Sequence, residues 1–369
     1  MRTVHVVPVL LAIIFVVSVA AARPAGDGVQ KADAVRLLAH TDNEVAKALE
    51  QGCKVVRHAR QLRAVACPKA AVAALGLPED IRVFAVDTGA NTQVKADLVH
   101  SAGNTGSGRV IAVLDTGVDY NHAQLSDSII KGRDFVDDDD DPLDLNGHGT
   151  HVAGLITANS GKARGVAPDA QVLAVRVLDK DGGGFFSDII AAIYWAADSG
   201  YGVDAISMSL GTSRPYTYKG FCDNVFPDMT NAVKYARDKN VLVVVAAGNA
   251  GNAGISIPGC ISHSFTVGAV DKSDRVASFS GRGSALDVTA PGVSLYSTWL
   301  NNGFATASGT SMSTPIVAGI AGLVKSAHNA YTDEQVEQAL VKTAKDLGKS
   351  GFDTSFGWGR IDAQKAVAY

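Results

Sequence analysis

Short, almost continuously apolar runs alternate with helical stretches from about residue 103 onward. The runs cover residues 110–114, 172–177, 205–210, 241–247 and 265–270. Strands that are buried on both faces, as in a parallel sheet, have this pattern. Helical stretches lie between them near residues 148–157, 187–199 and 228–239. The alternation predicts an α/β fold built on a doubly wound, mostly parallel sheet.

The pattern before residue 90 predicts a second, small α+β unit. Its expected strands are residues 35–39, 53–58, 62–67 and 81–86, and its expected helices are residues 43–50 and 68–75. Asp42 is of a type that caps a helix N-terminus, so we expect it to cap the first of these helices. A unit this small buries little core and is only marginally stable alone. We therefore expect it to fold against a partner.

The N-terminus has the pattern of an export signal. Arg2 precedes a mostly apolar stretch over residues 6–19, and the three alanines at 20–22 offer a cleavage site. We predict a signal peptide over residues 1–22, a linker with the small unit over residues 23–90, and the main domain over residues 91–369. An uncleaved membrane anchor is the alternative, because residues 6–22 approach the length of a short span. A secreted, extracellular chain without stable membrane association is the main expectation.

The net charge bears on nucleic-acid binding, and the cysteine content bears on disulfide formation. The formal net charge of -4 over 369 residues gives no basic face for nucleic acid. An exported chain can oxidise its four cysteines. Cys53 and Cys67 are symmetric about the middle of an expected hairpin, so antiparallel pairing would place them opposite each other. Cys222 and Cys260 then remain as the second pair by elimination.

Four polar residues stand where the predicted strands end or helices begin. Asp115 lies in VLDTG (residues 113–117), His148 in NGHGTH (146–151), Asn249 in AAGN (246–249) and Ser311 in GTSMSTP (309–315). In open α/β sheets, ligands bind beyond the carboxyl ends of the strands. Each residue alone is more often a cap or a structural residue. Together they supply a carboxylate, an imidazole, an amide and a hydroxyl at one edge of the sheet.

These groups match the needs of acyl transfer by a serine. A serine hydroxyl is a weak nucleophile until a neighbouring base takes its proton, and a carboxylate can orient that base. His148 is the expected base and Asp115 the expected orienting carboxylate. Asn249 could donate a hydrogen bond to the oxyanion of the tetrahedral intermediate. An inactive relative that serves as a binding or scaffold protein is the alternative, but all four groups are present.

The four motifs resemble those of the subtilisin family, in particular its thermitase-like and proteinase-K-like branches, and they follow the family's order of Asp, His and Ser. The resemblance covers residues 96–369, and the small unit resembles the family's propeptide. It implies a secreted serine endopeptidase made as a self-processing precursor. Protein or peptide substrates, the chain's own propeptide as intramolecular inhibitor, and a monomeric state are expected with it.

The resemblance also implies where a substrate would lie. An extended peptide would pair with Gly182, Gly183 and Gly184 on one side and with Ser209, Leu210 and Gly211 on the other. Phe186 would form an aromatic wall for the fourth residue before the cut. The pocket for the residue just before the cut would be lined by Ala246, Ala247 and Gly248, with Ser256 near its base. Small neutral walls predict a roomy pocket without charge selectivity.

An acidic run precedes the motif of His148. Residues 137–141 are five consecutive aspartates, and thermitase-like relatives carry a calcium loop at this position. Oxygen ligands without thiol or imidazole suit Ca²⁺, so Asp137, Asp139 and Asp141 are its expected ligands. Asp287 matches another cation-binding aspartate of the family. A solvated acidic loop is the alternative.

Two further patterns are set aside. The glycines of residues 103–108 precede a strand, whereas a dinucleotide fingerprint joins a strand to a helix. His148 and His151 lack the spacing and the glutamate of a zinc-peptidase helix, so His151 is expected to be structural.

Overall fold

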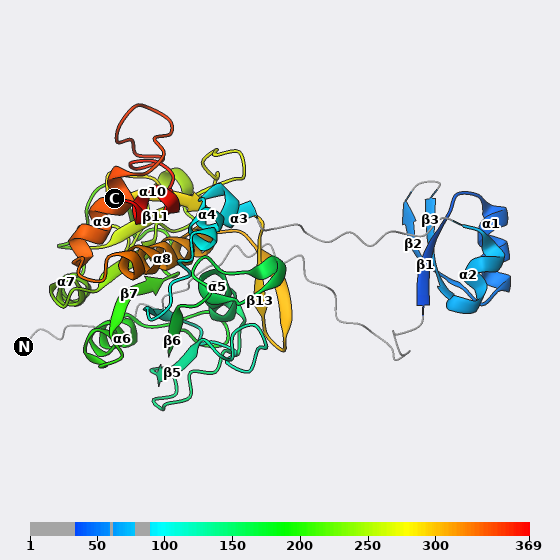
Figure 1. The fold of residues 1–369 in the computed structure, drawn as a ribbon, viewed down its shortest axis with the longest axis horizontal. Coiled ribbons are helices and arrows are strands. Elements are labelled where there is room, and N and C mark those ends of the chain that lie inside the picture. Colours follow the sequence, from blue (N-terminus) through cyan, green and yellow to red (C-terminus); the bar gives the residue numbers. More distant parts are fainter. Residues whose placement is uncertain (1–33, 60–61, 78–88) are drawn as a thin grey trace, which may run out of the picture. The chain divides into compact units, whose positions relative to one another are not determined.

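The computed structural model describes residues 34–59, 62–77 and 89–369 (Figure 1). Residues 34–77 belong to one compact unit and residues 89–369 to another. The predicted signal peptide, the linker that follows it and the strand predicted at residues 81–86 lie outside the described residues.

The small unit is a three-stranded antiparallel sheet with two helices. Its elements are β1 (Ala34–Ala39), α1 (Asp42–Glu50), β2 (Lys54–Ala59), β3 (Leu62–Pro68) and α2 (Lys69–Leu75), with β3 in the centre of the sheet. Its core comprises Leu37, Ala48, Cys53, Val65, Cys67 and Ala71. Cys53 and Cys67 form a disulfide across the β2–β3 hairpin, with their Cα atoms 4.2 Å apart. The pairing expected from the hairpin symmetry is therefore present.

The cap of α1 differs from the prediction. Thr41 is the N-cap, and Asp42 is the first helical residue. The Thr41 side chain accepts the N–H of Glu44 at 3.2 Å, while the Glu44 carboxylate accepts the N–H of Thr41 at 2.9 Å. This reciprocal pair satisfies two N–H groups at once, whereas Asp42 could satisfy only one.

The large unit is built on one seven-stranded sheet in which every neighbouring pair of strands is parallel. The strand order is β12-β11-β9-β7-β4-β6-β5. The strands are β4 (Val110–Asp115), β5 (Ile129–Asp134), β6 (Gln171–Arg176), β7 (Val203–Met208), β9 (Leu242–Ala246), β11 (Phe265–Val270) and β12 (Val288–Pro291). The predicted doubly wound α/β fold is confirmed.

Helices cover both faces of this sheet (Figure 1). α5 (His148–Thr157) and α8 (Thr310–Ala327) pack together on one face, and α6 (Phe186–Asp198) and α7 (Pro227–Asp238) pack together on the other. A hydrophobic core lies on each face of the sheet, and alternate residues of β4 belong to one core or the other. Ile111 and Val113 pack in the core with α5 and α8, while Ala112 and Leu114 pack in the core with α6 and α7. Every residue of β4 is buried, which explains its continuously apolar sequence.

Shorter elements complete the unit. Two antiparallel pairs lie outside the main sheet, β8 (Thr217–Tyr218) with β10 (Ile255–Ser256) and β13 (Leu295–Trp299) with β14 (Gly303–Ala307). The remaining helices are α3 (Gly89–Gln93), α4 (Ala96–Ser101), α9 (Asp333–Lys342) and α10 (Ala363–Val367). Among the described helices, none combines the length and apolarity needed to span a membrane.

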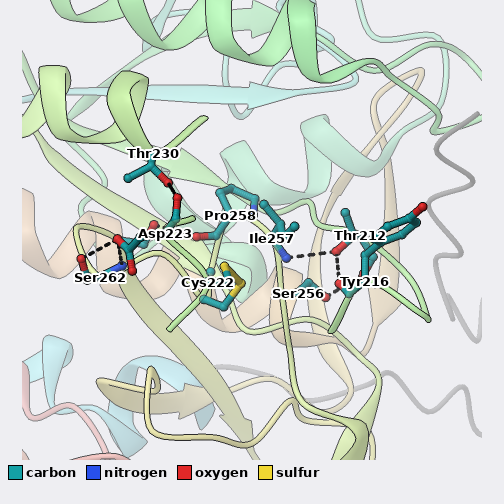
Figure 2. Close-up of a disulfide and its surroundings, with 12 residues drawn as sticks. Thr212, Tyr216, Cys222, Asp223, Thr230, Ser256, Ile257, Pro258 and Ser262 are labelled. Carbon is teal, nitrogen blue, oxygen red and sulfur yellow. Dashed lines mark hydrogen bonds between the residues drawn. A yellow bond between two sulfur atoms is a disulfide. The ribbon is translucent and has the colours of Figure 1, made fainter. Parts of the chain in front are cut away.

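A disulfide joins Cys222 to Cys260, with the Cα atoms 5.4 Å apart (Figure 2). It links the segment that follows β8 to the loop that follows β10. Both sulfur atoms are buried in the core beneath α6 and α7. The second cysteine pair, expected by elimination, is thus present as well.

Candidate active site

Asp115 and His148 form a buried pair. Asp115 is the last residue of β4, and His148 is the first residue of α5. His148 Nδ1 lies 2.7 Å from Asp115 Oδ1, and the two side chains are 2% and 0% exposed. The N–H at Nδ1 therefore donates to the carboxylate, and the buried contact fixes both the tautomer and the orientation of the imidazole.

Two glycines allow α5 to begin at this point. Gly147 has φ +109°, and a Cβ there would lie 2.4 Å from the indole of Trp299. A Cβ on Gly149 would lie 2.1 Å from the carbonyl oxygen of Gly117, beside the side chain of Asp115. A larger residue at position 149 would press the helix away from the end of β4 and from Asp115, whereas one at position 147 would clash with Trp299 of β13.

Asp144 holds the loop before α5. Its carboxylate accepts the N–H groups of Asn146, Gly147 and Thr150 and the hydroxyls of Thr116 and Thr150, at 2.6–2.9 Å. Burial raises the pKa of Asp144, and these hydrogen bonds oppose that shift. Asp144 follows the acidic run of residues 137–141 closely in the sequence, but the structure gives it a separate role as the N-terminal anchor of the helix that carries His148.

Asp144→Ala should lower the free energy of unfolding by about 3 kcal/mol or more, since it leaves several buried donors without an acceptor. Thermal and denaturant unfolding would be measured in a Ser311→Ala background, which prevents self-digestion from obscuring the result. Asp140→Ala is the matched control, because this exposed aspartate of the same loop pairs with Arg133 on the surface. Equal effects of the two changes would contradict the anchoring role.

Ser311 is the second residue of α8 and exchanges two hydrogen bonds with Ser209, which follows β7. The Ser311 hydroxyl donates to the Ser209 carbonyl at 3.2 Å, and the Ser209 hydroxyl donates to the Ser311 carbonyl at 2.8 Å. Pro315 has no N–H, so the Ser311 carbonyl lacks its usual donor four residues on, and Ser209 replaces it. Since β7 pairs with β4, these contacts tie Ser311 to the strand next to that of Asp115.

Asn249 follows β9 and is held by its carbonyl oxygen. The N–H and the hydroxyl of Thr310 both donate to Asn249 Oδ1, at 3.0 and 3.1 Å. These two donors identify the side-chain oxygen of Asn249 and so fix the orientation of its amide group. Nδ2 is then the atom that can donate a hydrogen bond to a bound ligand. The backbone N–H of Ser311 lies in the first turn of α8, where N–H groups have no acceptor within the helix.

His151 is structural, as expected. It is fully buried in α5, and its Nε2 lies 3.2 Å from the carbonyl oxygens of Leu295 and Ala305. Burial lowers the pKa of His151 to about 4, so it remains neutral at physiological pH. It ties α5 to the β13–β14 hairpin.

A cavity of about 290 Å³ opens beside Ser311. It is lined by Ser209, Leu210, Gly211, Thr212, Ser213, Arg214, Ala246, Gly248, Asn249, Ala250, Ser256, Thr310 and Ser311. Six of the predicted substrate residues therefore gather there: Ser209, Leu210, Gly211, Ala246, Gly248 and Ser256. Ala247 is instead fully buried in the core, with its N–H bonded to Val267. The sequence analysis did not identify Thr212, Ser213, Arg214, Ala250 or Thr310.

Phe186 lies in a second, mostly apolar cavity. Phe185, Tyr216, Val225, Phe226 and Ile257 line it with Phe186, and Thr212 lines both cavities. Gly182, Gly183 and Gly184, predicted to pair with the substrate, are not among the residues that line either cavity. They form a tight turn, in which the N–H and carbonyl of Gly183 bond to Asp179. A Cβ on Gly184 would lie 2.4 Å from the Val177 carbonyl, which accounts for glycine there.

The carboxylates of the acidic run have separate partners within the protein. Asp137 pairs with Arg176 at 2.5 Å, and Asp141 accepts the Tyr120 hydroxyl at 2.5 Å. Asp139 accepts the N–H of Asp141. Arg133 pairs with the two remaining aspartates of the run. No group of three or more candidate metal-ligating side chains is present in the described part of the chain, so these contacts do not fit a shared ion.

Asp287 is buried apart from this run. Burial raises its pKa to about 8, and its Oδ2 accepts the N–H of Thr266 at 2.6 Å. A cation bound beside this carboxyl would favour its ionised form, so burial alone does not decide whether Asp287 is a ligand. The calcium site therefore stays a prediction from the sequence, and no catalytic step is derived through it.

Comparison with known proteins agrees with this geometry. A family model described as the subtilase family matches residues 106–359. Thermophilic serine proteinase from Bacillus sp. (strain AK1) is 47% identical over 266 residues, which are 71% of this chain and 62% of that protein. The chain thus spans less than two thirds of the length of this relative. Thermitase from Thermoactinomyces vulgaris is 43% identical over 267 residues, or 72% of this chain and 90% of the relative.

A third relative extends the agreement. Subtilisin BL from Lederbergia lenta is 40% identical over 278 residues, which are 75% of this chain and 97% of the relative. The matched region contains the parallel sheet, Asp115, His148, Asn249 and Ser311. The chain therefore belongs to the subtilase family of serine endopeptidases.

Proposed function

We propose that the chain cleaves peptide bonds of protein substrates through Ser311 as nucleophile, His148 as general base and Asp115 as orienting carboxylate. The observation that carries the proposal is the buried 2.7 Å contact between His148 and Asp115 at the carboxyl end of β4. The cavity that Ser311 shares with Asn249 supports it further.

In the first half of the reaction, the Ser311 hydroxyl attacks the scissile carbonyl while His148 Nε2 takes its proton. His148 then delivers that proton to the leaving amine, and an acyl-enzyme on Ser311 remains. Asp115 stays ionised and stabilises the imidazolium that forms between these steps. In the second half, water attacks the acyl group with His148 again as base, and Ser311 is regenerated.

The oxyanion of each tetrahedral intermediate receives two donors. Asn249 Nδ2 is one, because its carbonyl oxygen is already held by Thr310. The backbone N–H of Ser311 is the other, and its place in the first turn of α8 adds the favourable field of the helix N-terminus.

Asn249→Ala should lower kcat by about 100- to 1000-fold with little change in KM, because this donor acts on charge that develops only in the transition state. Initial rates on a chromogenic peptide would be compared with those of Asn252→Ala. Asn252 lies on the same loop and its side chain accepts a hydrogen bond from Arg282. If the variant raised KM and left kcat unchanged, Asn249 would not be a donor to the oxyanion.

We further propose that the chain is exported as a precursor whose small unit is an inhibitory propeptide. Its own core and the Cys53–Cys67 disulfide are consistent with a separately folded segment before the large unit. Intact-mass analysis and N-terminal sequencing of the secreted protein test both statements. A mature chain that still carried Met1 would contradict the cleaved signal, and one that kept residues 34–77 would contradict propeptide removal.

Chelation of calcium distinguishes a calcium site in the acidic run from a loop that is held by protein contacts alone. If Ca²⁺ binds the folded state there, EGTA should lower Tm and accelerate self-digestion, since the ion stabilises by mass action. Replacing Asp137, Asp139 and Asp141 by asparagine should then reproduce the effect and abolish further sensitivity. If the arginine contacts alone hold the run, EGTA should leave Tm unchanged. Differential scanning fluorimetry with and without added Ca²⁺ gives the answer.

The peptidase proposal itself is tested with an unfolded protein as substrate. Wild-type enzyme should produce new amino termini at many positions, and an organophosphate that modifies serine should stop their formation. Failure to cleave any unfolded protein by the mature enzyme would overturn the proposal and favour a binding role.

A further inference from the structure

One charged side chain stands at the rim of the cavity beside Ser311. Of the described residues that line this cavity, Arg214 is the only charged one, and the others are small or neutral. The sequence analysis predicted a pocket without charge selectivity, because it considered residues 246–248 and Ser256 but did not bring residue 214 to the pocket. Here the structure differs from that prediction.

Arg214 connects two of the segments that line the cavity. Residues 209–214 form one of them, and Ala246, Gly248, Asn249 and Ala250 belong to the other. Arg214 Nη2 donates to the carbonyl oxygen of Ala250 at 3.2 Å, next to Asn249. The guanidinium therefore lies at the residue that follows Asn249, and its other N–H groups make no hydrogen bond within the described part of the chain.

The backbone that carries Arg214 is fixed at Thr212 (Figure 2). Ser256 Oγ donates to the Thr212 carbonyl at 2.8 Å, and the N–H of Ile257 donates to Thr212 Oγ1 at 3.0 Å. The Thr212 hydroxyl in turn donates to the Tyr216 carbonyl at 2.5 Å. These bonds attach the segment to Ser256, which lines the cavity, and to its neighbour Ile257.

The turn around Arg214 is closed as well. The N–H of Tyr216 donates to the Ser213 carbonyl at 2.9 Å, and the Cys222–Cys260 disulfide ties the segment that follows to the same loop (Figure 2). The position of Arg214 at the rim is thus set by the fold, although its side chain is exposed.

Arg214 has no carboxylate partner in the described part of the chain; its one hydrogen bond there goes to a backbone carbonyl. Other arginines of the large unit do pair: Arg133 with two aspartates, Arg176 with two, and Arg237 with Asp333 and Glu337. A guanidinium presents a planar fork of donors that suits a carboxylate. An uncompensated one beside a nucleophile can receive that carboxylate from a substrate.

We propose that Arg214 is a specificity-determining residue that favours an acidic side chain, Glu or Asp, immediately before the scissile bond. The inference rests on the proposed function, because it takes Ser311 as the group that attacks the carbonyl. The side chain next to that carbonyl is the one that enters the cavity shared by Ser311 and Asn249. Arg214 receives its carboxylate at the rim, and the neutral walls accept its methylene groups.

The test uses peptides that differ only in the residue before the cut, with Glu, Gln, Leu or Lys at that position. Wild-type kcat/KM should be about tenfold higher for Glu than for Gln, a size expected for one charge-assisted contact that is weakened by exposure. Raising the salt concentration should reduce the ratio. Arg214→Gln should make Glu and Gln equal while the rate on Leu is retained, and Arg214→Glu should favour Lys.

Lys219→Gln is the matched control, since it removes the same charge from an exposed residue of the same segment that does not line the cavity. It should leave the Glu-to-Gln ratio unchanged. Equal rates on Glu and Gln in the wild type, or a ratio that survives Arg214→Gln, would overturn the inference. If the Leu peptide were cleaved in those experiments, only the specificity of Arg214 would be wrong and the proposed peptidase function would hold. If no peptide were cleaved, the proposed peptidase function itself would be contradicted.

Discussion

Ser311→Ala should lower the rate of peptide hydrolysis by about a millionfold, because the three groups act as a unit and no other hydroxyl can form the acyl-enzyme. The fold should be kept. The hydrogen bond from Ser209 goes to the Ser311 backbone carbonyl, which alanine retains, and only the bond from the Ser311 hydroxyl is lost. Initial rates over long incubations, with circular dichroism as the check on folding, measure this change.

The same variant should remain an uncut precursor. Ser313→Ala is the matched control on the same helix, because Ser313 is buried and its hydroxyl donates to the Ala290 and Pro291 carbonyls. It should be processed and active, with some loss of stability. Processing of Ser311→Ala when it is expressed alone would show that another protease removes the small unit. A residual rate above about one per cent would exclude Ser311 as the nucleophile.

Asp115→Asn should lower kcat by about ten-thousandfold, which is typical of loss of the orienting carboxylate. The amide has the shape of the carboxylate, but it can donate to His148 Nδ1 and so favour the tautomer that carries its proton on Nε2. That tautomer cannot accept the Ser311 proton. The prediction depends on the 2.7 Å contact and on the burial of both side chains.

Asp119→Asn provides the comparison for Asp115→Asn. Asp119 is a buried carboxylate close in sequence, and it accepts N–H groups from Asn121 and Asn301. Its replacement should affect stability more than turnover. If Asp115→Asn reduced kcat by less than about tenfold, the orienting role would be wrong.

The sheet was largely predictable because its central strands are buried on both faces. β4 and β11 have every residue buried, so their composition alone distinguishes them. β5 was missed since its sequence, IIKGRD, mixes apolar and charged residues, as befits an edge strand that is only partly buried. β12 has four residues and ends in proline, which makes it too short to stand out as a strand.

The site was predictable to the extent that its residues follow strands. Asp115 comes directly after an apolar run and Asn249 comes two residues after another, so topology alone brings them to one edge of the sheet. Asp144 could not be separated from the acidic run by composition, because only burial shows which carboxylate points into the protein. Arg214 depended on a contact with Ala250, 36 residues further along the chain, which no local pattern reveals.

Covalent labelling tests the central claim most directly. Mature enzyme would be treated with an organophosphate, digested by another protease, and mapped by mass spectrometry. The account predicts one adduct per chain, on the peptide that contains Ser311, with loss of activity in proportion to labelling and much slower labelling of His148→Ala. An adduct on a different residue, or full activity after complete modification of Ser311, would contradict it.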